Sequence, residues 1–520
     1  MYDVAIIGCG PVGALAANLC GKAGLNTLVI EKEANPYPLP RAVHLDHEMM
    51  RFFQAADLID DVVGDMRDTE GHLHVGADLG VIRYMGTKGQ ARPFGWSNDY
   101  FFYQPELEDH LRDALAKYDN VELKLGTEFT LLKQAEGQPV ALTISHQGQA
   151  QTVDAQWVIA CDGARSSVRK FLNIELDDLK FDEPWLVVDA EVDGPVRFPD
   201  IWGMPEDADI QQLSVMMCDP KRPATVVPGR GNHRRWEFML LPDEDPQAMM
   251  QPENVAPLME PWLGAIPHKI VRAATYRFHA LIAEQWQQGQ VFLAGDAAHQ
   301  TPPFFGQGMC HGLRDVSNLV WKMELIFKGL APRSILQTYQ EERDPHVRAV
   351  ISTAVDAGRY ICVLDENKAA ARDADIREKA ASGQLAKTGA GIIPPLKAGV
   401  VATHTSGAGE RFIQPSLQTD SGEQLMDNIL GCGWRLFAAN ASLAAQAQQT
   451  LAQWPAQFNV RVVDCQTLAD AGAIAAWLEQ HNAKTVVVRP DAYVFGTANS
   501  AAELLSQLAQ SLSLEIEPCH

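Results

Sequence analysis

The sequence contains few cysteines and no long apolar run, and each absence excludes a class of protein. Its nine cysteines are scattered through 520 residues, too sparsely for the disulfide framework of a small secreted domain. No run of about 18 apolar residues occurs, so no membrane-spanning helix is predicted. The N-terminus has Asp3 and a strand pattern where a secretory signal would carry a basic segment. We therefore expect a cytoplasmic protein.

Positive charge is also scarce, and internal repeats and low-complexity tracts are absent. The chain has 43 Lys and Arg against 66 Asp and Glu, a formal net charge of -23. Such a field repels phosphate, which argues against nucleic acid and anionic membranes as partners. A hydrophobic content of 46% is that of an ordinary globular protein, and the length allows two to four domains.

The first thirty residues have the pattern of one βαβ unit. An apolar strand over 4–7 precedes a helical segment over 14–23, and a second strand over 27–30 ends at Glu31. The turn after the first strand carries three spaced glycines, Gly8-x-Gly10-x-x-Gly13. This spacing suits a tight turn, close approach to a pyrophosphate and close helix packing, with Glu31 placed to bind ribose hydroxyls. It predicts a dinucleotide site; a plain glycine turn is the alternative.

Two further motifs follow predicted strands. Asp162 and Arg165 come after the strand over 157–160, and Asp296 comes after the strand that starts at Val291. The second motif continues into a glycine-rich turn with Pro303, Gly306, Gly308 and Met309. An aspartate at a strand end can bind ribityl or ribose hydroxyls, and the glycines would let main-chain amides approach a ring. Each motif alone could be a structural turn, but the three in this order are hard to explain otherwise.

The pattern of elements predicts an α/β protein with an inserted sheet. Strand-like segments over 184–275 lack a βαβ rhythm, which indicates a mainly antiparallel β domain. Strands alternate with helices again near the C-terminus. The predicted domains are 1–183 and 276–362 for the two parts of the first domain, 184–275 for the insert, 363–424 for a connecting segment and 425–520 for a small α/β domain.

In this order, the three motifs resemble the single-component FAD-dependent aromatic hydroxylases (class A flavoprotein monooxygenases). The likeness is closest to the 3-(3-hydroxyphenyl)propionate hydroxylases and spans most of the chain. Further segments that carry it are Pro40-Arg41-Ala42, Phe102-Tyr103-Gln104-Pro105, Cys218-Asp219-Pro220, Arg235-Trp236-Glu237, Trp321-Lys322 and Val488-Arg489-Pro490-Asp491. The resemblance implies a Rossmann-like FAD-binding domain, an inserted substrate-binding sheet and a thioredoxin-like C-terminal domain.

The resemblance also assigns the cofactor. NAD(P)H would reduce FAD, and O2 would form a flavin C4a-hydroperoxide that hydroxylates a phenolic acid such as 3-(3-hydroxyphenyl)propionate. The residues implied in FAD binding are Gly8, Gly10, Gly13, Glu31, Arg41, Gln104, Asp162, Asp296, Pro303, Gly306, Gly308 and Met309. NAD(P)H would bind without a second fingerprint of its own.

A phenol is activated by losing its proton, so a base or relay is expected beside the flavin. The candidates are His44, Asp46 and His47, whose alternative role is helix capping. A substrate carboxylate would suit an arginine, because the planar guanidinium pairs with it bidentately. Candidates for substrate contact are Arg222, Arg234, Arg235, Tyr276 and His279, and for each of them a plain structural or surface role is the stronger alternative. We predict no metal site, because His44 and His47 lack supporting ligands nearby in sequence.

Two features depart from the family pattern or leave alternatives open. Relatives usually carry Asn where this chain has Cys310, which changes the polarity beside the ring. Cys432, Cys465 and Cys519 are isolated, so the C-terminal domain has no Cys-x-x-Cys pair. We therefore expect this domain to give structural support or to form a homodimer contact.

Three alternatives to this function remain. One is a hydroxylase of hydroxybenzoate or resorcinol, and another is a flavin halogenase, for which only half the signature is present near Trp262. The third is a flavin-binding protein without turnover.

Overall fold

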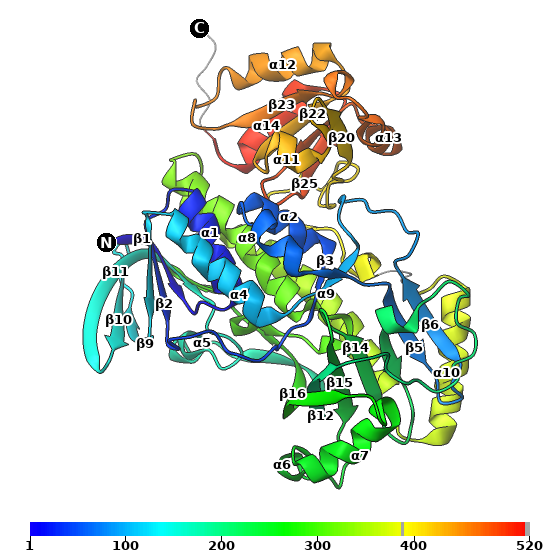
Figure 1. Cartoon of the computed structure of the whole chain (residues 1–520). Coiled ribbons are helices and arrows are strands. Elements are labelled where there is room, and N and C mark those ends of the chain that lie inside the picture. Colours follow the sequence, from blue (N-terminus) through cyan, green and yellow to red (C-terminus); the bar gives the residue numbers. More distant parts are fainter. Residues whose placement is uncertain (386–388, 515–520) are drawn as a thin grey trace.

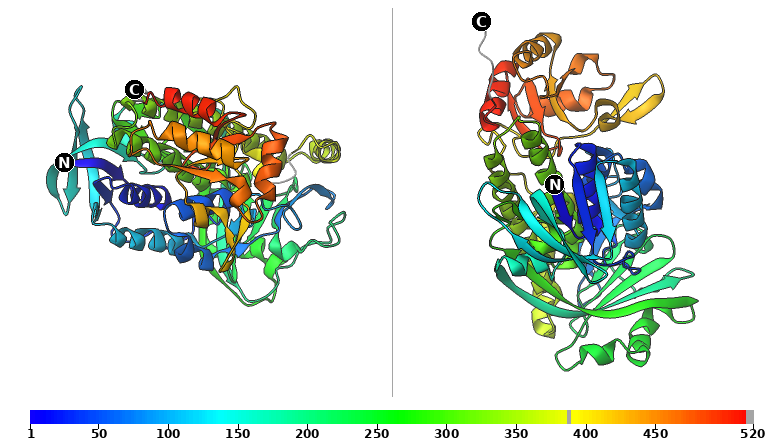
Figure 2. Two further views of the ribbon diagram at one scale, coloured as in Figure 1. Left: turned by 90° about the horizontal axis from the view of Figure 1, so that it is seen from above. Right: turned by 90° about the vertical axis from the view of Figure 1, so that its left-hand side faces the viewer.

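A computed structural model describes residues 1–385 and 389–514. Figure 1 shows three parts: a central α/β layer, a second sheet to its lower right and a C-terminal α/β unit above it. The right-hand view of Figure 2 also shows the C-terminal unit and the second sheet at opposite ends of the central layer. Among the described residues, no helix has the length and apolar character needed to cross a membrane.

The central sheet is parallel where the three sequence motifs meet. β1 pairs with β2 on one side and with β11 on the other, and β11 pairs with β18, all in parallel. The strands in this order are β17 (Gln287–Gln288), β18 (Val291–Leu293), β11 (Gln149–Ala160), β1 (Tyr2–Ile7), β2 (Thr27–Glu31) and β8 (Val121–Leu125). Parallel strands present their carboxyl ends at one edge, so the segments after β1, β2, β11 and β18 share that edge.

Helices cover the central sheet, and this shields its apolar strands from water. Both faces of β1 are buried, from Val4 to Ile7, which fits a parallel sheet between helices. The helix predicted over 14–23 runs from Pro11 to Lys22, because Pro is favoured at the first helical position. The principal covering helices are α1 (Pro11–Lys22), α4 (Gln104–Asp113), α8 (Gln307–Phe327) and α9 (Thr338–Ile361). β10 (Val140–His146) pairs in antiparallel with β11 on one side and with β9 (Thr127–Lys133) on the other, so the three strands form a meander.

The second sheet is mainly antiparallel, as predicted, but draws on more of the chain than 184–275. In spatial order its strands are β19 (His299–Gln300), β16 (His268–Ala283), β12 (Leu176–Val192), β15 (His233–Met239), β14 (Ala224–Pro228), β13 (Ser214–Met217), β5 (Gly71–Val75) and β6 (Val81–Gly86). β5 joins β13 in parallel across more than a hundred residues of chain. A local sequence pattern does not show which sheet a strand joins. The predicted first segment, 1–183, therefore includes β5 and β6, although both strands belong to the second sheet. The domain limits themselves stay a prediction.

A small three-stranded sheet brings the early loop next to the second sheet. Its strands are β3 (His44–Asp46), β7 (Asp99–Phe101) and β4 (Arg67–Asp68), with β7 in the centre. The antiparallel register sets His44 opposite Phe101 and Asp46 opposite Asp99. The loop after Arg41 therefore has a fixed position between the two main sheets.

The segment 363–424, predicted to be an irregular connection, is irregular only in part. α10 (Glu366–Ala381) is a regular helix that packs against β6. Its sequence is rich in Ala and charged residues and has only one buried large apolar residue, Ile376, so its periodicity is weak. Tertiary contacts of Arg372 with the carbonyl oxygens of Tyr360 and Cys218 fix the helix instead.

The C-terminal unit has the strand order and directions of a thioredoxin-like fold. Its sheet runs β23 (Val460–Asp464), β22 (Trp434–Ala438), β24 (Thr485–Val488) and β25 (Val494–Ala498). The first pair is parallel and the other two are antiparallel. Cys432 and Cys465 are free thiols here, and Cys519 lies outside the described residues. The packed helices are α12 (Ala441–Leu451), α13 (Gly472–Gln480) and α14 (Ala501–Ser511).

Candidate flavin and substrate site

The glycine turn after β1 has open space where a pyrophosphate would lie. Gly8 has a φ of +96°, and a Cβ there would lie 2.5 Å from the Cys161 carbonyl oxygen. A Cβ on Gly13 would collide with the Gly8 carbonyl oxygen, so the helix needs glycine to pack this close. A Cβ on Gly10, by contrast, would meet no atom within 4 Å, and Gly10 precedes α1 without a side-chain cap. The free amides of that helix terminus therefore face an open space suited to phosphate.

Glu31 and Arg112 fix this turn from two sides. The Glu31 carboxylate accepts a hydrogen bond from the Cys9 amide at 2.8 Å, and Arg112 Nε donates to the Cys9 carbonyl at 2.8 Å. Arg112 Nη1 is buried without a hydrogen-bond partner among the described residues. An unpaired buried guanidinium nitrogen beside a phosphate-sized space fits an anionic ligand. The sequence motifs do not identify Arg112, although it lies in the helix that begins at Gln104.

Gln104 shapes the loop that carries Arg41. Its Oε1 accepts hydrogen bonds from the amides of Arg41 at 3.1 Å and Ala42 at 2.6 Å, and its Nε2 donates to Glu108 at 2.6 Å. Both ends of the Gln104 side chain are thus used within the protein. The Arg41 side chain is 55% exposed and lies 3.7 Å from Glu108, so its guanidinium can reach a cofactor.

The other two motifs end at the same edge of the sheet. Asp162 Oδ2 accepts hydrogen bonds from the Ser167 amide at 2.7 Å and the Val168 amide at 3.2 Å, and so holds the start of α5 (Ser167–Phe171). Asp296 is exposed to solvent, yet desolvation by the surrounding protein raises the pKa of its carboxyl. A side chain that is both accessible and desolvated lines an internal space, as expected of a cofactor ligand.

The turn before α8 presents main-chain amides toward this space. Gly306 is left-handed, with a φ of +62°, and α8 begins after it without a side-chain cap. A Cβ on Gly308 would meet nothing within 4 Å, and Met309 is half-buried against the core. Cys310 is fully buried and donates from Sγ to the Gly306 carbonyl at 3.6 Å. The Cys310 thiol is thus bonded inside the first turn of α8.

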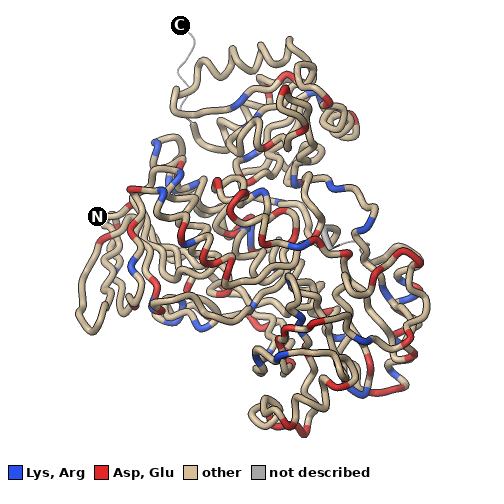
Figure 3. The backbone as a smooth tube through the Cα atoms, viewed as in Figure 1, with Lys and Arg blue, Asp and Glu red and all other residues tan. Residues whose placement is uncertain are grey.

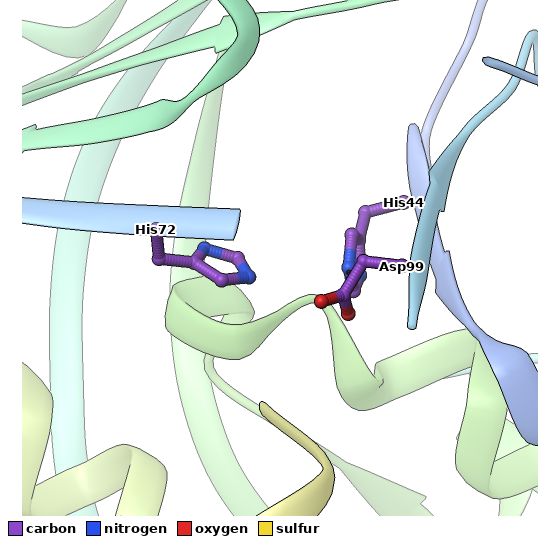
Figure 4. A group of neighbouring side chains, drawn as sticks. All are labelled: His44, His72 and Asp99. Carbon is purple, nitrogen blue, oxygen red and sulfur yellow. Dashed lines mark hydrogen bonds and ion pairs between the residues drawn. The ribbon is translucent and has the colours of Figure 1, made fainter. Parts of the chain in front are cut away.

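His44 is the predicted catalytic residue that lies against this turn. Its Nε2 is 2.9 Å from Asp99 Oδ1, and its Nδ1 lies against Gly306 without a partner of hydrogen-bond geometry among the described residues. Burial alone would lower the pKa of His44, but the hydrogen bond and charge of Asp99 raise it above its ordinary value. Figure 4 shows His72 approaching the pair from β5 of the second sheet. The rings of His44 and His72 make an edge contact with centroids 5.4 Å apart.

The other two predicted catalytic residues are held in structural contacts. Asp46 caps α2 (His47–Ala55) and accepts a hydrogen bond from Arg314 at 2.5 Å. Arg314 also binds Glu48 at 2.8 Å, so the Asp46 carboxylate belongs to a buried ion network. His47 is fully buried against Phe94, and desolvation lowers its pKa to about 4. The structure therefore places His44 at the glycine turn and does not bring Asp46 and His47 together with it.

His44, His72 and Asp99 also form a group whose potential ligand atoms lie within 4.8 Å of one another. Nothing in the sequence indicates this group, because its members come from three separate strands. A zinc-type ion needs ligand atoms about 2.0–2.2 Å from its centre. The direct His44–Asp99 hydrogen bond uses one such ligand atom of each residue, so the geometry favours a hydrogen-bonded pair over a metal site.

The predicted substrate contacts are divided between two faces of the second sheet. Arg235 donates to Asp189 at 2.8 Å and to the carbonyls of Arg41 at 2.6 Å and Pro40 at 2.7 Å. Arg222 is paired with Glu244 and donates to the Met239 carbonyl at 2.9 Å. The guanidinium groups of Arg235 and Arg222 are therefore both occupied within the protein and do not bind a substrate carboxylate.

Tyr276 is half-buried on the face of β16 that meets the central domain, with the Arg272 guanidinium 5.4 Å from its ring centroid. His279 lies three residues after Tyr276 on the same strand, so its side chain points from the opposite face of the sheet. Its Nδ1 is 3.6 Å from Asp182 Oδ1. Arg234 likewise alternates with Arg235 and is bonded to the carbonyls of Gly231 and His233.

Comparison with known proteins agrees with this geometry over the whole chain. Residues 1–354 match the family model described as an FAD binding domain, and residues 409–512 match the HcaD C-terminal domain. The probable NADH-specific resorcinol 4-hydroxylase of Rhodococcus jostii is 34% identical over 99% of this chain and 95% of its own. The 3-(3-hydroxy-phenyl)propionate/3-hydroxycinnamic acid hydroxylase of Burkholderia cenocepacia is 34% identical over 96% and 94% of the two chains.

Solved structures have the same fold. The flavin-dependent monooxygenase PieE, in complex with FAD and substrate, has a TM-score of 0.81 at 21% identity over 98% of this chain and 99% of its own. Aklavinone-11 hydroxylase, in a ternary complex with FAD and aklavinone, has a TM-score of 0.77 at 22% identity over 98% and 99%. The chain belongs to the family of FAD-dependent aromatic monooxygenases.

Proposed function

We propose that this monooxygenase hydroxylates a phenol that carries a second substituent in the meta position. The observation that carries the proposal is the His44–Asp99 pair, which lies against the glycine turn before α8. Relatives named for two meta-substituted phenols, resorcinol and 3-(3-hydroxyphenyl)propionate, support this substrate class. One of them is named as NADH-specific, so NADH is the first reductant to test.

The residues at the carboxyl edge of the central sheet fit FAD. Gly10 and Arg112 would hold the pyrophosphate, Glu31 the adenosine ribose, Arg41 and Asp296 the middle of the cofactor, and the amides around Gly308 its ring. The FAD group supplies hydride acceptance and the reaction with O2 when bound, while the protein positions it and excludes water. Asp162, Gln104 and Pro303 would act through the backbone segments that they hold.

In this proposal His44 takes the phenolic proton. Asp99 would hold the Nε2–H of the ring, and Nδ1, which lies against the backbone of Gly306, would be the acceptor. Loss of the proton makes the aromatic ring electron-rich and therefore reactive toward an electrophilic oxygen. The pair thus supplies general-base catalysis at a buried position, where a neutral imidazole is effective.

The test is NADH oxidation and O2 uptake by the purified FAD-loaded protein with a panel of phenols. The panel contains resorcinol, 3-(3-hydroxyphenyl)propionate, 3-hydroxybenzoate and phenol, and peroxide and products are measured alongside. We expect one meta-substituted phenol to stimulate both rates and to yield a product with one more hydroxyl group. Peroxide without product would indicate a ligand that promotes reduction only. No stimulation by any phenol would contradict the proposal and favour a flavin protein without turnover.

A cytoplasmic location and a homodimer remain predictions from the sequence. Acidic and basic positions are interspersed over the described chain (Figure 3), and the surplus of acids supports small molecules rather than polyanions as partners.

A further inference from the structure

Glu237 lies at the centre of the second sheet and points toward the FAD-binding domain. Side chains alternate along β15, so Glu237 shares its face with Arg235 and Met239, and Trp236 and Phe238 share the other. Met239 belongs to the core shared with the central domain, whereas Trp236 and Phe238 belong to the separate core beneath α7 (Pro252–Leu263). The carboxylate of Glu237 therefore faces the flavin side.

Contacts on either side locate Glu237 between two segments of the proposed site. Arg235, two residues before it, binds the carbonyls of Pro40 and Arg41. Trp185, which pairs with Met239 two residues after it, contacts Phe304 with ring centroids 5.9 Å apart. Glu237 thus faces the gap between the loop that leads to His44 and the turn that leads to Gly306.

Glu237 keeps more accessible surface than its neighbours on the adjacent strands. It is half-buried, whereas its cross-strand partners Val187 and Thr225 are buried at 3% exposure each. Burial nevertheless raises the pKa of its carboxyl to about 7. Accessibility in the middle of a sheet that is covered on both faces indicates an enclosed space. Within residues 1–385 and 389–514, no hydrogen bond or ion pair uses the Glu237 carboxyl, so its oxygens are available to a ligand.

The arginines of this face are held by another carboxylate. Asp189 is fully buried and accepts from Arg235 at 2.8 Å, and Arg272 Nε lies 3.2 Å from it. Arg272 Nε and Nη1 are buried, so those atoms do not reach the space that Glu237 lines. Arg272 is 8% exposed whereas Glu237 is half-buried, so the more accessible charge at this point is an acid.

We propose that Glu237 determines substrate specificity by accepting a hydrogen bond from the second hydroxyl of an uncharged meta-diphenol and disfavouring phenols with a carboxylate side chain. The inference rests on the proposed function and chooses between its two substrate types. A hydroxyl can donate to the carboxyl in either protonation state, whereas a carboxylate substrate would meet a like charge once Glu237 ionises.

The experiment titrates the FAD-loaded enzyme with resorcinol and with 3-(3-hydroxyphenyl)propionate and follows the flavin absorbance. At pH 8 we expect resorcinol to bind at least about tenfold more tightly to the wild type, as one hydrogen bond to a charged group would give. Glu237→Gln, which keeps the size of the side chain, should reduce that ratio about tenfold or more. Glu191→Gln, on the same sheet but exposed and 3.8 Å from Lys269, should leave it unchanged.

The pH dependence supplies a second readout. Because the pKa of Glu237 is raised to about 7, its charge is absent below that value, and the carboxylated phenol should bind better at pH 6 than at pH 8. Glu237→Gln should reduce that difference to the background that the other groups give. Other titratable or charged groups persist in the variant and serve as its background: Arg235, Asp189, Arg272, Tyr276, His72, His74 and Arg83 on this face of the second sheet, and Arg41 and His44 on the loop that meets it.

Two outcomes would overturn the assignment of Glu237 while leaving the hydroxylase intact. One is equal or tighter binding of the carboxylated phenol by the wild type, and the other is an unchanged ratio in Glu237→Gln with normal FAD content. If neither phenol perturbs the flavin spectrum nor stimulates NADH oxidation, the proposed function itself fails, and the inference fails with it.

Discussion

At the scale of single residues, burial and partners separate three neighbouring candidates that look alike in sequence. His44, Asp46 and His47 lie within four positions, but only His44 places a ring nitrogen, Nδ1, against the backbone of Gly306 in the glycine turn. Asp46 neutralises Arg314, and His47 is packed against Phe94. The chemistry of each residue is therefore set by the surfaces that fold over it.

The proposed role of His44 gives a prediction for activity and its pH dependence. His44→Gln should lower kcat by about 10²–10⁴-fold, the usual contribution of a general base, with FAD content unchanged. In the wild type only the neutral ring can accept a proton, so kcat should rise with pH through a pKa above the ordinary histidine value. Asp99→Asn removes the raising interaction, so the rise should move to lower pH. The measurement is product formation across the range from mildly acidic to mildly alkaline pH.

The matched control is His279→Gln, because this half-buried histidine points from the opposite face of the second sheet. It should leave kcat and the pH profile unchanged. If His44→Gln kept the wild-type kcat and pH profile, another residue would have to be the base.

At the scale of elements, the second sheet is attached to the early loop by one buried arginine. Arg235 on β15 joins Asp189 on β12 to the carbonyls of Pro40 and Arg41. Burial would raise the pKa of Asp189, but Arg235 and His233 lower it to about 2. The loop with Arg41 and the sheet with Glu237 are therefore held in one arrangement by this contact.

Arg235→Met should reduce the free energy of unfolding by about 3–5 kcal/mol, because it leaves Asp189 buried without its main partner. The stabilisation from Asp189 is fully present above the ordinary aspartate pKa of about 3.9 and is lost as the pH falls toward about 2. The difference between wild type and variant should therefore shrink in acid. Urea unfolding at several pH values measures this.

The control for Arg235 is Arg222→Met, whose half-buried pair with Glu244 should cost about 1 kcal/mol. The double variant Arg235→Met with Asp189→Asn should recover part of the loss, because the unpaired carboxylate charge is removed while the amide oxygen can still accept from Arg272. A double variant no more stable than Arg235→Met alone would show that the ion pair is not the cause.

At the scale of the whole molecule, a buried charge network joins the C-terminal unit to the helices of the central domain. Glu342 on α9 lies 2.7 Å from Arg489 of the C-terminal unit and 3.1 Å from Lys322 of α8. Its carboxylate also accepts the Val400 amide at 2.8 Å. Burial lowers the pKa of Lys322 to about 8, although Glu342 counteracts this effect. The network makes the thioredoxin-like unit part of one folded body rather than a tethered appendage.

Glu342→Gln should cost about 3–5 kcal/mol of stability and should make the C-terminal unit unfold before the rest. Differential scanning calorimetry would then resolve two transitions where the wild type has one. Asp375→Asn breaks an exposed pair with Lys379 at 2.7 Å and should cost under about 1 kcal/mol. A single unshifted transition in Glu342→Gln would mean that the network does not couple the two parts.

The cofactor class and much of the order of helices and strands follow from local sequence patterns. Gly8, Gly10 and Gly13 directly follow a strand and open a helix, so their spacing carries the dinucleotide geometry locally. The strands predicted in the C-terminal unit are present because runs such as Thr485–Val488 are largely apolar and fully buried. Such features depend on neighbours a few residues away in the chain and can therefore be predicted from the sequence.

Tertiary structure alone decided which side chains meet in the site. His44, Asp99 and His72 come from β3, β7 and β5, and the pairing of β15 with β12 sets Glu237, which is half-buried, opposite the buried Val187. The same long-range pairing drew β5 and β6 into the second sheet and bound Arg235 to Asp189 rather than to a substrate. Contacts between residues far apart in the chain set burial and charge balance, and these quantities separate a catalytic or specificity residue from a structural one.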